Sequence, residues 1–348
     1  MSRWASDPEA AAEDLIRRSL DAIDLKGRVL LANHTGALPA LLAERGVDAG
    51  LWTRRLAGSA RAQPWPPAGP FDIALLRLPK AKDEQEMAAH ACLSVLVPGG
   101  RLIVYGGNDE GIRSAGSRLE EVCGEVETLS TRGHGRVLAA RRPADTTPLR
   151  ASLAAWRSVA PLAVAGVVRD WVSYPGVFAT GRIDEGTALL IGALSALRPG
   201  DRVLDYGCGS GVIGAAALAA APDIVLDLLD DDAVALEAAR ENVGGAHLVL
   251  GAGLADAGAT DYAAILSNPP LHKGITEDHA LLEQFIADAP VHLRSGGCLQ
   301  IVVQRRIPLE RLLSKHFAGV AVPAENGRYR VWRARLSLSP LFAGRGSG

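Results

Sequence analysis

Two stretches of the chain combine acceptor side chains with tight turns. The first runs from Asp205 through Gly207, Gly209 and Gly211, directly after the apolar residues 203–204. Glycines at this spacing let the backbone turn sharply and pass close to a ligand. A strand, a glycine turn and a helix open a nucleotide-binding β-α-β unit, whose ligand lies at the carboxyl end of the strand. This stretch therefore predicts a cofactor site.

Asp205 distinguishes between two kinds of cofactor. Residues 209–214 form a G-x-G-x-x-G, and Asp230 follows about 20 residues later, as in a dinucleotide fingerprint. A carboxylate at Asp205 would repel a pyrophosphate, but it would attract the ammonium group of S-adenosylmethionine. Asp230 ends the next apolar strand, where an acid can bind both ribose hydroxyls. These residues therefore favour a cationic ligand such as S-adenosylmethionine over a dinucleotide, with Asp230 at the ribose.

Two further acids adjoin Asp230. We expect Asp231 to contribute to the cofactor site, because it lies at the same strand end. We expect Asp232 to cap the helix predicted over residues 233–242, since aspartate is a favoured N-cap residue.

The second stretch is Asn268-Pro269-Pro270, after the apolar residues 263–266. Two prolines stiffen the turn and remove two backbone donors, which leaves the Asn268 oxygen and a backbone carbonyl as acceptors. Acceptors aimed at an exocyclic amine orient its lone pair toward an electrophilic methyl group, and positioning supplies much of the rate. We predict that Asn268, Pro269 and Pro270 are catalytic; an ordinary Asn-Pro turn is the alternative.

Three residues after the prolines are candidates for substrate binding: Leu271, His272 and Lys273. His272 could assist proton removal or contact a phosphate, although a lone loop histidine is often structural or solvated. Lys273 could contact a phosphate, although exposed lysines are common.

Alternating strand and helix patterns surround these turns. In the first half, apolar periodicity predicts helices over 7–23, 84–96 and 118–123, and strands over 28–32, 72–78, 101–105 and 137–140. In the second half, it predicts helices over 187–197 and 212–221 and a final antiparallel strand over 328–336. The predicted fold class is α/β, with mostly parallel sheets and helices on both faces.

The second half repeats the first. Arg202-Val-Leu-Asp matches Arg28-Val-Leu-Leu, residues 262–269 match 71–79, and Ser-Gly-Gly at 295–297 matches Pro-Gly-Gly at 98–100. This order predicts a duplication: two tandem Rossmann-like methyltransferase domains. The first copy has one glycine, Gly36, and no acid at the position of Asp205, so we expect it to be degenerate and without cofactor. Because residues 142–148 are rich in proline, threonine and charge, we place the domains at 1–150 and 151–348, with a connecting segment at 151–187.

Composition narrows the class of protein. The chain has 348 residues, 48% of them hydrophobic, which suits two globular domains. It has no apolar run of membrane-spanning length, and its N-terminus does not resemble a signal peptide. The four cysteines are scattered, so we expect a cytoplasmic protein without a metal site or disulfides.

The net charge of −2 argues against a uniformly basic nucleic-acid binder, but residues 305–335 carry eight Lys/Arg against two acids. This segment could meet phosphate, or it could be a solvated edge strand.

Together these motifs resemble class I S-adenosylmethionine-dependent methyltransferases. More narrowly, the chain is similar to the bacterial small-subunit ribosomal RNA guanine-N2 methyltransferases and their large-subunit relatives. The matching segments are the degenerate-domain motifs at 78–82 and 107–114, the entry to the catalytic domain at 175–178 and 184–187, and the catalytic loop at 268–274.

The resemblance implies methyl transfer to N2 of a guanine in ribosomal RNA, free or in a ribosomal subunit. It implies that Asp205 and the glycines bind the methionine end of the cofactor and that Asp230 binds the ribose. We expect Phe178 and Thr187, in the entry segment, to contact the cofactor. Asn268 would contact both the cofactor and the target amine.

Two positions depart from the family pattern. Leu271 stands where an aromatic ring usually stacks on the target base. An acid near position 252, which would contact adenine, is absent, and Asp256 lies slightly further on. Both positions bear on the choice of substrate, whereas methyl transfer as a reaction class depends on neither.

Three other functions compete with this one. The Asn-Pro-Pro turn would equally serve methylation of another amine, such as a glutamine side chain in a protein. The two departures would also suit a non-catalytic RNA-binding assembly factor. A dehydrogenase would fit the G-x-G-x-x-G alone.

Overall fold

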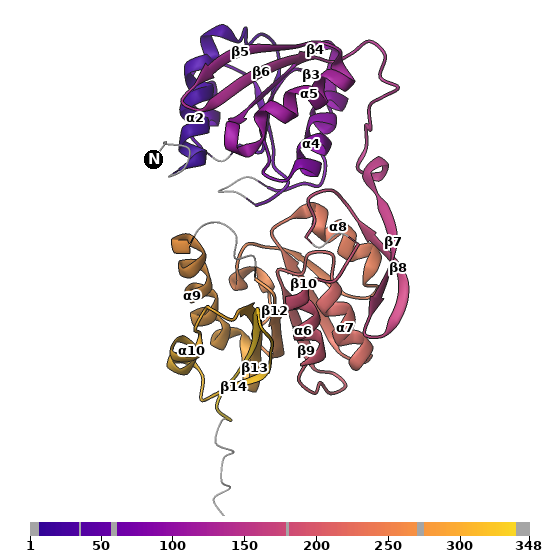
Figure 1. Ribbon diagram of the computed structural model, residues 1–348, viewed down its shortest axis with the longest axis vertical. Coiled ribbons are helices and arrows are strands. Elements are labelled where there is room, and N and C mark those ends of the chain that lie inside the picture. Colours follow the sequence, from indigo (N-terminus) through magenta and orange to yellow (C-terminus); the bar gives the residue numbers. More distant parts are fainter. Residues whose placement is uncertain (1–6, 35, 57–60, 179–180, 270–274, 339–348) are drawn as a thin grey trace, which may run out of the picture. The chain divides into compact units, whose positions relative to one another are not determined.

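The structure, a computed structural model, describes residues 7–34, 36–56, 61–178, 181–269 and 275–338. The chain divides into two units (Figure 1). Unit 1 consists of Met1–Ser158, Tyr174–Gly176 and Asp232–Val234, and unit 2 consists of Val159–Ser173, Val177–Asp231 and Ala235–Gly348. Each unit contains one large sheet with helices on both faces.

Unit 1 is built on a six-stranded sheet of order β2-β1-β3-β4-β6-β5. The strands are β1 (Val29–Ala32), β2 (Ala49–Trp52), β3 (Phe71–Arg77), β4 (Leu96–Gly107), β5 (Val126–Arg132) and β6 (Gly135–Arg141). The first four strands in the sheet order are parallel, and β6 and β5 run antiparallel. The mostly parallel sheet predicted for this half is confirmed.

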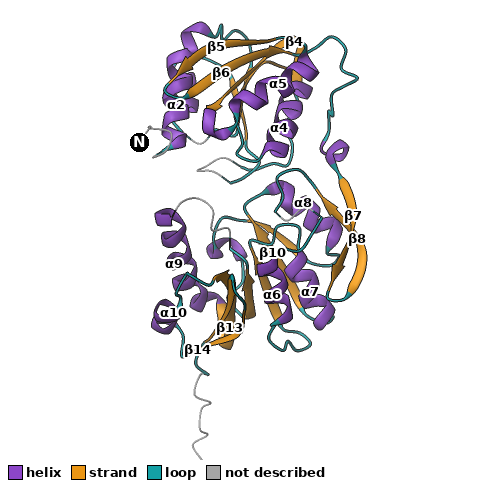
Figure 2. Cartoon of the chain, viewed as in Figure 1, coloured by secondary structure: helices purple, strands orange, loops and turns teal. Residues whose placement is uncertain are grey.

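Helices cover both faces of the unit 1 sheet (Figure 2). They are α2 (Pro8–Ser19), α3 (Leu38–Glu44), α4 (Lys82–Val95) and α5 (Ile112–Cys123), with 3-10 turns η1 (Leu20–Ala22) and η2 (Asn108–Glu110). Helices α2 and α3 pack with Val29 and Leu31 on one face, while α4 and α5 pack with Leu30 and Leu76 on the other. The predicted helix over 7–23 is wrong in its last turn, which is 3-10, and the helix predicted from 118 begins at Ile112.

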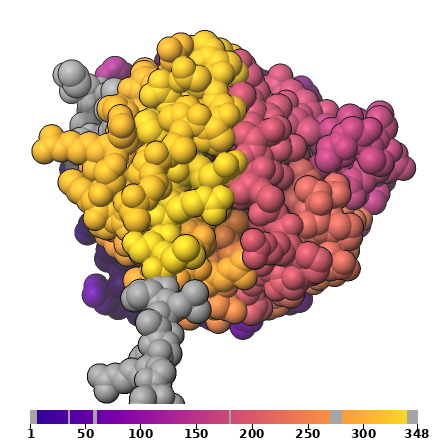
Figure 3. All heavy atoms as spheres, turned by 90° about the horizontal axis from the view of Figure 1, so that it is seen from below, coloured from indigo at the N-terminus to yellow at the C-terminus, as the bar shows by residue number. Residues whose placement is uncertain are grey.

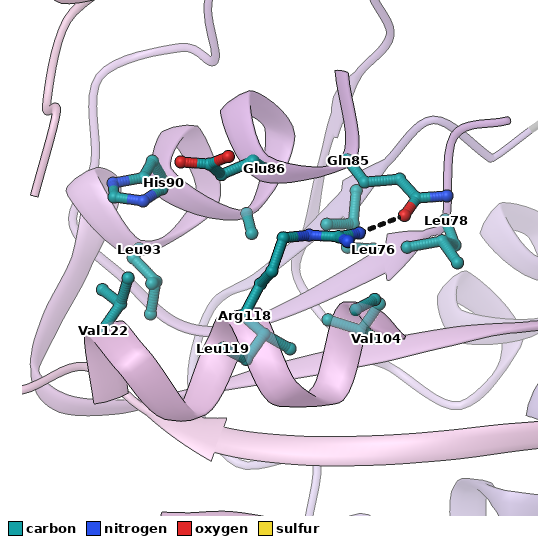
Figure 4. A pocket seen from close by; sticks show the side chains of 12 residues that line it. Leu76, Leu78, Gln85, Glu86, His90, Leu93, Val104, Arg118, Leu119 and Val122 are labelled. Atoms are coloured by element: carbon teal, nitrogen blue, oxygen red, sulfur yellow. Dashed lines mark hydrogen bonds between the residues drawn. The ribbon is translucent and has the colours of Figure 1, made fainter. Parts of the chain in front are cut away.

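A small cavity lies between α4, α5 and the unit 1 sheet (Figure 4). Its volume is about 20 Å³, which is room for roughly one water molecule. Leucine, valine and alanine side chains line most of it, and Arg118 donates a hydrogen bond to Gln85 at its margin. The cavity is therefore a packing defect of the apolar layer.

Unit 2 is built on a seven-stranded sheet of order β11-β10-β9-β12-β13-β15-β14. The strands are β9 (Arg202–Tyr206), β10 (Val225–Asp230), β11 (His247–Leu250), β12 (Tyr262–Ser267), β13 (Leu293–Gln304), β14 (Gly319–Glu325) and β15 (Tyr329–Arg335). Five strands are parallel, and β15 pairs antiparallel with β13, which confirms the predicted final strand. The last strands form a continuous part of the surface, yellow in Figure 3.

The helices of unit 2 are α6 (Glu185–Gly192), α7 (Val212–Ala220), α8 (Ala233–Asn242), α9 (Ile275–His292) and α10 (Glu310–His316), with a 3-10 turn η4 (Leu254–Ala257). The predicted helix over 187–197 is wrong at both ends, because α6 begins two residues earlier, at Glu185 after its cap Asp184, and ends at Gly192. A hairpin of β7 (Ser158–Val164) and β8 (Val167–Ser173), preceded by the 3-10 turn η3 (Leu153–Trp156), occupies the connecting segment. The sequence did not predict this hairpin.

The two sheets repeat each other in register. Val29 of β1 pairs with Ile73, and Val203 of β9 pairs with Ala264. The next ladder in each sheet also has a register shift at its start. The shift lies between Phe71 and Ile73 where β3 pairs with β4, and between Tyr262 and Ala264 where β12 pairs with β13. The predicted duplication is therefore confirmed.

Ladder position identifies the equivalent residues of the two units. Two residues after Val29 and Val203 lie Leu31 and Asp205. Four residues after Ile73 and Ala264 lie Arg77 and Asn268. Leu31 thus stands where unit 2 has Asp205, and Arg77 where it has Asn268.

Candidate active site

The glycine turn after β9 has a backbone that few other residues could adopt. Gly207, Gly209 and Gly211 have φ values of 68°, 54° and 87°, all in the left-handed region. A Cβ atom on Gly211 would lie 2.7 Å from Val243 Cγ2, whereas a Cβ on Gly209 would meet nothing within 4 Å. The turn is therefore packed on one side and open on the other, where a ligand can approach the backbone.

Asp230 ties this turn to the end of β10. Its Oδ2 accepts a hydrogen bond of 2.8 Å from the backbone N–H of Gly209. The side chain is half-buried, as is that of Asp231. Asp232 Oδ1 accepts from Val234 N at 2.9 Å, which confirms its predicted role as the cap of α8.

Asp205 is fully buried, at 0% exposure. Its Oδ2 accepts from Gly214 N, in the first turn of α7, at 2.8 Å. Its Oδ1 is also buried and has no hydrogen-bond partner among the residues that the structure describes. Burial raises the pKa of Asp205 to about 7, the Gly214 N–H opposes this shift, and the nearby Asp230 adds to it. One carboxylate oxygen thus stabilises α7, and the other is buried without a hydrogen-bond partner among the described residues.

The side-chain amide of Asn268 is oriented by two partners near the start of α6. Its Nδ2 donates to Thr187 Oγ1 at 2.9 Å and to the two carboxylate oxygens of Asp184 at 3.4 and 3.3 Å. These contacts use the nitrogen end of the amide. The oxygen end is therefore the acceptor that Asn268 offers at the carboxyl end of β12.

Asp184 is also the N-cap of α6. Its Oδ1 accepts from Gly186 N at 3.0 Å and from Thr187 N at 3.2 Å. A Cβ atom on Gly186 would lie 3.1 Å from Tyr329 Cδ1, so this glycine allows α6 to pack against β15. The start of α6 is thus fixed from two sides, and with it the amide of Asn268.

Thr187 and Phe178 were predicted to contact the cofactor. Thr187 is buried and contacts Asn268, while the side chain of Phe178 is largely exposed. Pro269, the second predicted catalytic residue, is half-buried directly after Asn268. Pro270, Leu271, His272 and Lys273 lie outside the residues that the structure describes.

Tyr206 forms another wall beside the glycine turn. Its ring stacks on Phe285 of α9, with centroids 4.4 Å apart, and its hydroxyl donates to Ala252 O at 3.3 Å. Burial raises the pKa of Tyr206 to about 12. Asp256 accepts from the backbone N–H groups of Ala252 at 2.9 Å and Gly253 at 3.2 Å. Its carboxylate therefore shapes the loop at Ala252 and Gly253.

Three residues that sequence reasoning missed attach the β7–β8 hairpin to the glycine turn. Trp171 Nε1 donates to Ser210 Oγ at 3.0 Å. Asn242 Oδ1 accepts from Val172 N at 2.7 Å, and its Nδ2 donates to Ser210 O at 3.1 Å. No local pattern signals these contacts, because each joins separate parts of the sequence.

Within the described ranges, no cluster of three or more His, Cys, Asp or Glu side chains could hold a metal ion. No helix in the described parts of the chain is long and apolar enough to cross a membrane.

Comparison with known proteins gives matches for both units. The chain matches the Methyltransferase small domain over residues 169–333 and the Methyltransferase small domain N-terminal over residues 15–156. Ribosomal RNA small subunit methyltransferase C of Pseudomonas aeruginosa (strain LESB58) is 35% identical over 286 residues, covering 81% of this chain and 85% of that protein. The protein of the same name from Stutzerimonas stutzeri (strain A1501) is 33% identical over 323 residues, covering 88% and 94%.

A solved structure shares the fold of the whole chain. The T. thermophilus 16S rRNA N2 G1207 methyltransferase, in complex with AdoMet and guanosine, superposes with a TM-score of 0.80. It is 22% identical in sequence, and the match covers 96% of this chain and 93% of that chain.

Proposed function

We propose, since the chain belongs to the ribosomal RNA small subunit methyltransferase C family, that it transfers a methyl group from S-adenosylmethionine to N2 of a guanine in ribosomal RNA. The single observation that carries this proposal is the orientation of Asn268. With its Nδ2 held by Asp184 and Thr187, the amide presents its oxygen to an incoming amine.

The reaction needs a positioned amine more than a strong base. Asn268 Oδ1 accepts a hydrogen bond from the N2 amine, so the nitrogen lone pair turns toward the methyl group. Bound S-adenosylmethionine supplies that methyl on a positively charged sulfur. Pro269 limits the freedom of the backbone beside Asn268 and keeps the acceptor in place. A guanine in a paired region would have to leave its stack to reach this edge.

The residues around the glycine turn suit S-adenosylmethionine. The buried Oδ1 of Asp205, without a hydrogen-bond partner among the described residues, could accept from the ammonium group. The open side of Gly209 leaves space for the methionine portion, beside Gly207 and Gly211. Asp230, half-buried at the end of β10, would bind the ribose hydroxyls.

Other site assignments complete the proposal. Asp231, Phe178, Thr187 and Asn268 would border the cofactor, and Pro270, Leu271, His272 and Lys273 would contact the RNA around the target base. Residues 151–348 would form the catalytic domain, and residues 1–150 would stabilise the fold without a cofactor. The partner would be ribosomal RNA or the small ribosomal subunit in the cytoplasm.

A methyl-transfer assay tests the proposal. Tritiated S-adenosylmethionine is incubated with the protein and either free ribosomal RNA or small ribosomal subunits that lack this modification, and the labelled nucleotide is mapped. We expect N2-methylguanine in one of the two substrates, formed about 10²–10³-fold more slowly with Asn268→Ala. Label on a protein glutamine, or no transfer by a protein that binds the cofactor, would overturn it.

A further inference from the structure

Exposed arginines gather beside Asn268 at the carboxyl edge of the unit 2 sheet. Arg305 and Arg306 directly follow β13, and Arg328 directly precedes β15. The backbone N–H of Arg305 donates to Arg328 O at 2.8 Å, so the two segments lie side by side. These residues belong to the basic segment whose role the sequence left open.

The ladder places this group close to the catalytic amide. Ser267 pairs with Ile301, so Asn268 lies level with the next residue of β13, and Arg305 lies three residues further on. With about 3.3 Å per residue and about 4.8 Å between strands, the Cα atoms of Asn268 and Arg305 are roughly 11 Å apart. An arginine side chain can span much of that distance.

Arg328 is linked to the same place through α6. Tyr329, the next residue, packs against Gly186, and the adjacent Asp184 holds the amide of Asn268. A nucleotide bound at Asn268 would therefore place its neighbouring phosphates near these guanidinium groups.

The arginines of this edge are weakly neutralised. The side chains of Arg305 and Arg328 are 51% and 74% exposed. Arg328 pairs with Glu185 at 3.1 Å, while Arg305 lies 3.9 Å from Glu325. Glu325 is held more closely by Arg330, at 2.6 Å. Exposed pairs of this kind contribute little, so a phosphate can replace them at small cost.

Arg306 adds a third positive charge. It is exposed and has no ion pair among the described residues. A guanidinium group offers a planar fork of donors that matches two phosphate oxygens. These three positive charges lie together at one edge of the sheet, although the chain as a whole has a net charge of −2.

We propose that Arg305, Arg306 and Arg328 bind the phosphates of the RNA strand that flanks the target guanine. The proposal rests on the proposed function and adds the surface that holds the RNA. Phosphate contacts of this kind set the register of the nucleic acid, while the catalytic edge reads the base.

The test compares two triple variants. The first is Arg305→Gln, Arg306→Gln and Arg328→Gln. The control removes three exposed arginines elsewhere on unit 2, by Arg198→Gln, Arg240→Gln and Arg335→Gln. Arg335 is the sharpest control, because it lies at the opposite end of β15 from Arg328. Both variants are measured for cofactor affinity by calorimetry, and for methylation of the substrate found above at several salt concentrations.

We expect the first variant to raise the KM for RNA at least tenfold while keeping kcat at saturating RNA and the affinity for S-adenosylmethionine. The slope of log(1/KM) for RNA against log salt concentration should decrease in magnitude by about 2, because each lost contact to a single strand accounts for about 0.7. The control should match the wild-type protein. An unchanged KM and salt slope in the first variant, or equal changes in both, would overturn this inference while the wild-type activity still supports the methyltransferase function.

Discussion

The carboxyl edges of the two sheets have the same register but opposite chemistry. In unit 2 the ladder position of Asn268 presents an amide, and in unit 1 the equivalent position holds Arg77. Arg77 is only 4% exposed and pairs with Glu9 at 3.1 Å and Glu110 at 2.6 Å. Glu110 also accepts from Gly107 N at 2.7 Å. In unit 1 this edge is closed by an ion-pair network.

The position of Asp205 shows the same contrast. Its equivalent Leu31 lies in the apolar core with α2 and α3. At the edge above, His34 Nδ1 lies 2.8 Å from the hydroxyl of the fully buried Tyr105. Burial lowers the pKa of His34, so it favours the neutral form. The same sheet thus has an edge filled by paired side chains in unit 1 and an edge with acceptor side chains, the proposed catalytic edge, in unit 2.

The largest effect should come from opening the closed edge. Arg77→Ala should lower the free energy of unfolding by about 3–5 kcal/mol, because it leaves Glu110 without its buried partner. Urea denaturation measures this loss, and Arg113→Ala, at an exposed arginine, is the control with a change within about 0.5 kcal/mol. The kcat of the folded protein should not change. A large loss of kcat at full folding would mean that unit 1 takes part in the chemistry.

At the equivalent position of unit 2, Asn268→Ala should act on chemistry and not on stability. We expect kcat to fall about 10²–10³-fold, the range for removing one transition-state hydrogen bond. The affinity for S-adenosylmethionine, measured by calorimetry, should stay within about twofold, since this affinity belongs mainly to the glycine turn. Unchanged turnover would remove Asn268 from the mechanism.

The buried carboxyl group of Asp205 should make the affinity for the cofactor depend on pH. The apolar Leu31, at the equivalent position of unit 1, cannot have this effect. Its pKa is about 7 without a ligand, and an ammonium group at Oδ1 would lower that pKa by favouring the charged form. Cofactor binding therefore requires loss of a proton below pH 7, and affinity should fall about tenfold per pH unit as pH decreases from 7. Calorimetry between pH 5.5 and 7 measures this slope, and Asp205→Asn should show none. A flat profile for the wild-type protein would leave Asp205 with only its contact to α7.

Substitutions of Thr187 distinguish a role in positioning Asn268 from a direct contact with the cofactor. Thr187→Val removes the oxygen that accepts from Asn268 Nδ2 while keeping the shape, so we expect kcat to fall about tenfold with cofactor affinity retained. Thr187→Ser should restore most of the rate. A fall in cofactor affinity with normal kcat would instead support the direct cofactor contact predicted from the sequence.

The smallest effect should come from the hairpin attachment. Asn242→Ala removes bonds to Val172 and to Ser210 in the glycine turn. We expect the loss of these bonds to cost about 1 kcal/mol in cofactor binding, which corresponds to about fivefold lower affinity, with kcat unchanged. Isothermal calorimetry measures it, and Glu237→Ala on the exposed side of α8 is the control. Equal affinity in both variants would show that the turn keeps its shape without the hairpin.

The sequence predicted the parallel strands and their turns because apolar runs and glycines report local structure. It missed β2, which has only four residues, and β5, whose side chains are largely exposed or half-buried. It missed the β7–β8 hairpin because its strands alternate weakly and lie in a segment read as a connection.

The candidate site was predictable in residue type but not in contacts. Asn268 stood out through its two prolines, yet its partners Asp184 and Thr187 lie 84 and 81 residues earlier. Asp205 was expected to attract a cationic ligand, and its position after β9 did not reveal that one of its oxygens accepts from Gly214 N in α7. Arg77 carried no local signal, because Glu9 lies 68 residues before it. Such pairings depend on tertiary packing, which spacing along the chain does not report.

Asp184 stabilises the first turn of α6 and the amide of Asn268 with the same carboxylate. Fraying of that turn would release the amide nitrogen, and the group could then rotate and offer a donor where the reaction needs an acceptor. With Asn268 in its proposed role, catalytic competence would depend on a local unfolding equilibrium. On heating, activity should then be lost while both sheets are still folded.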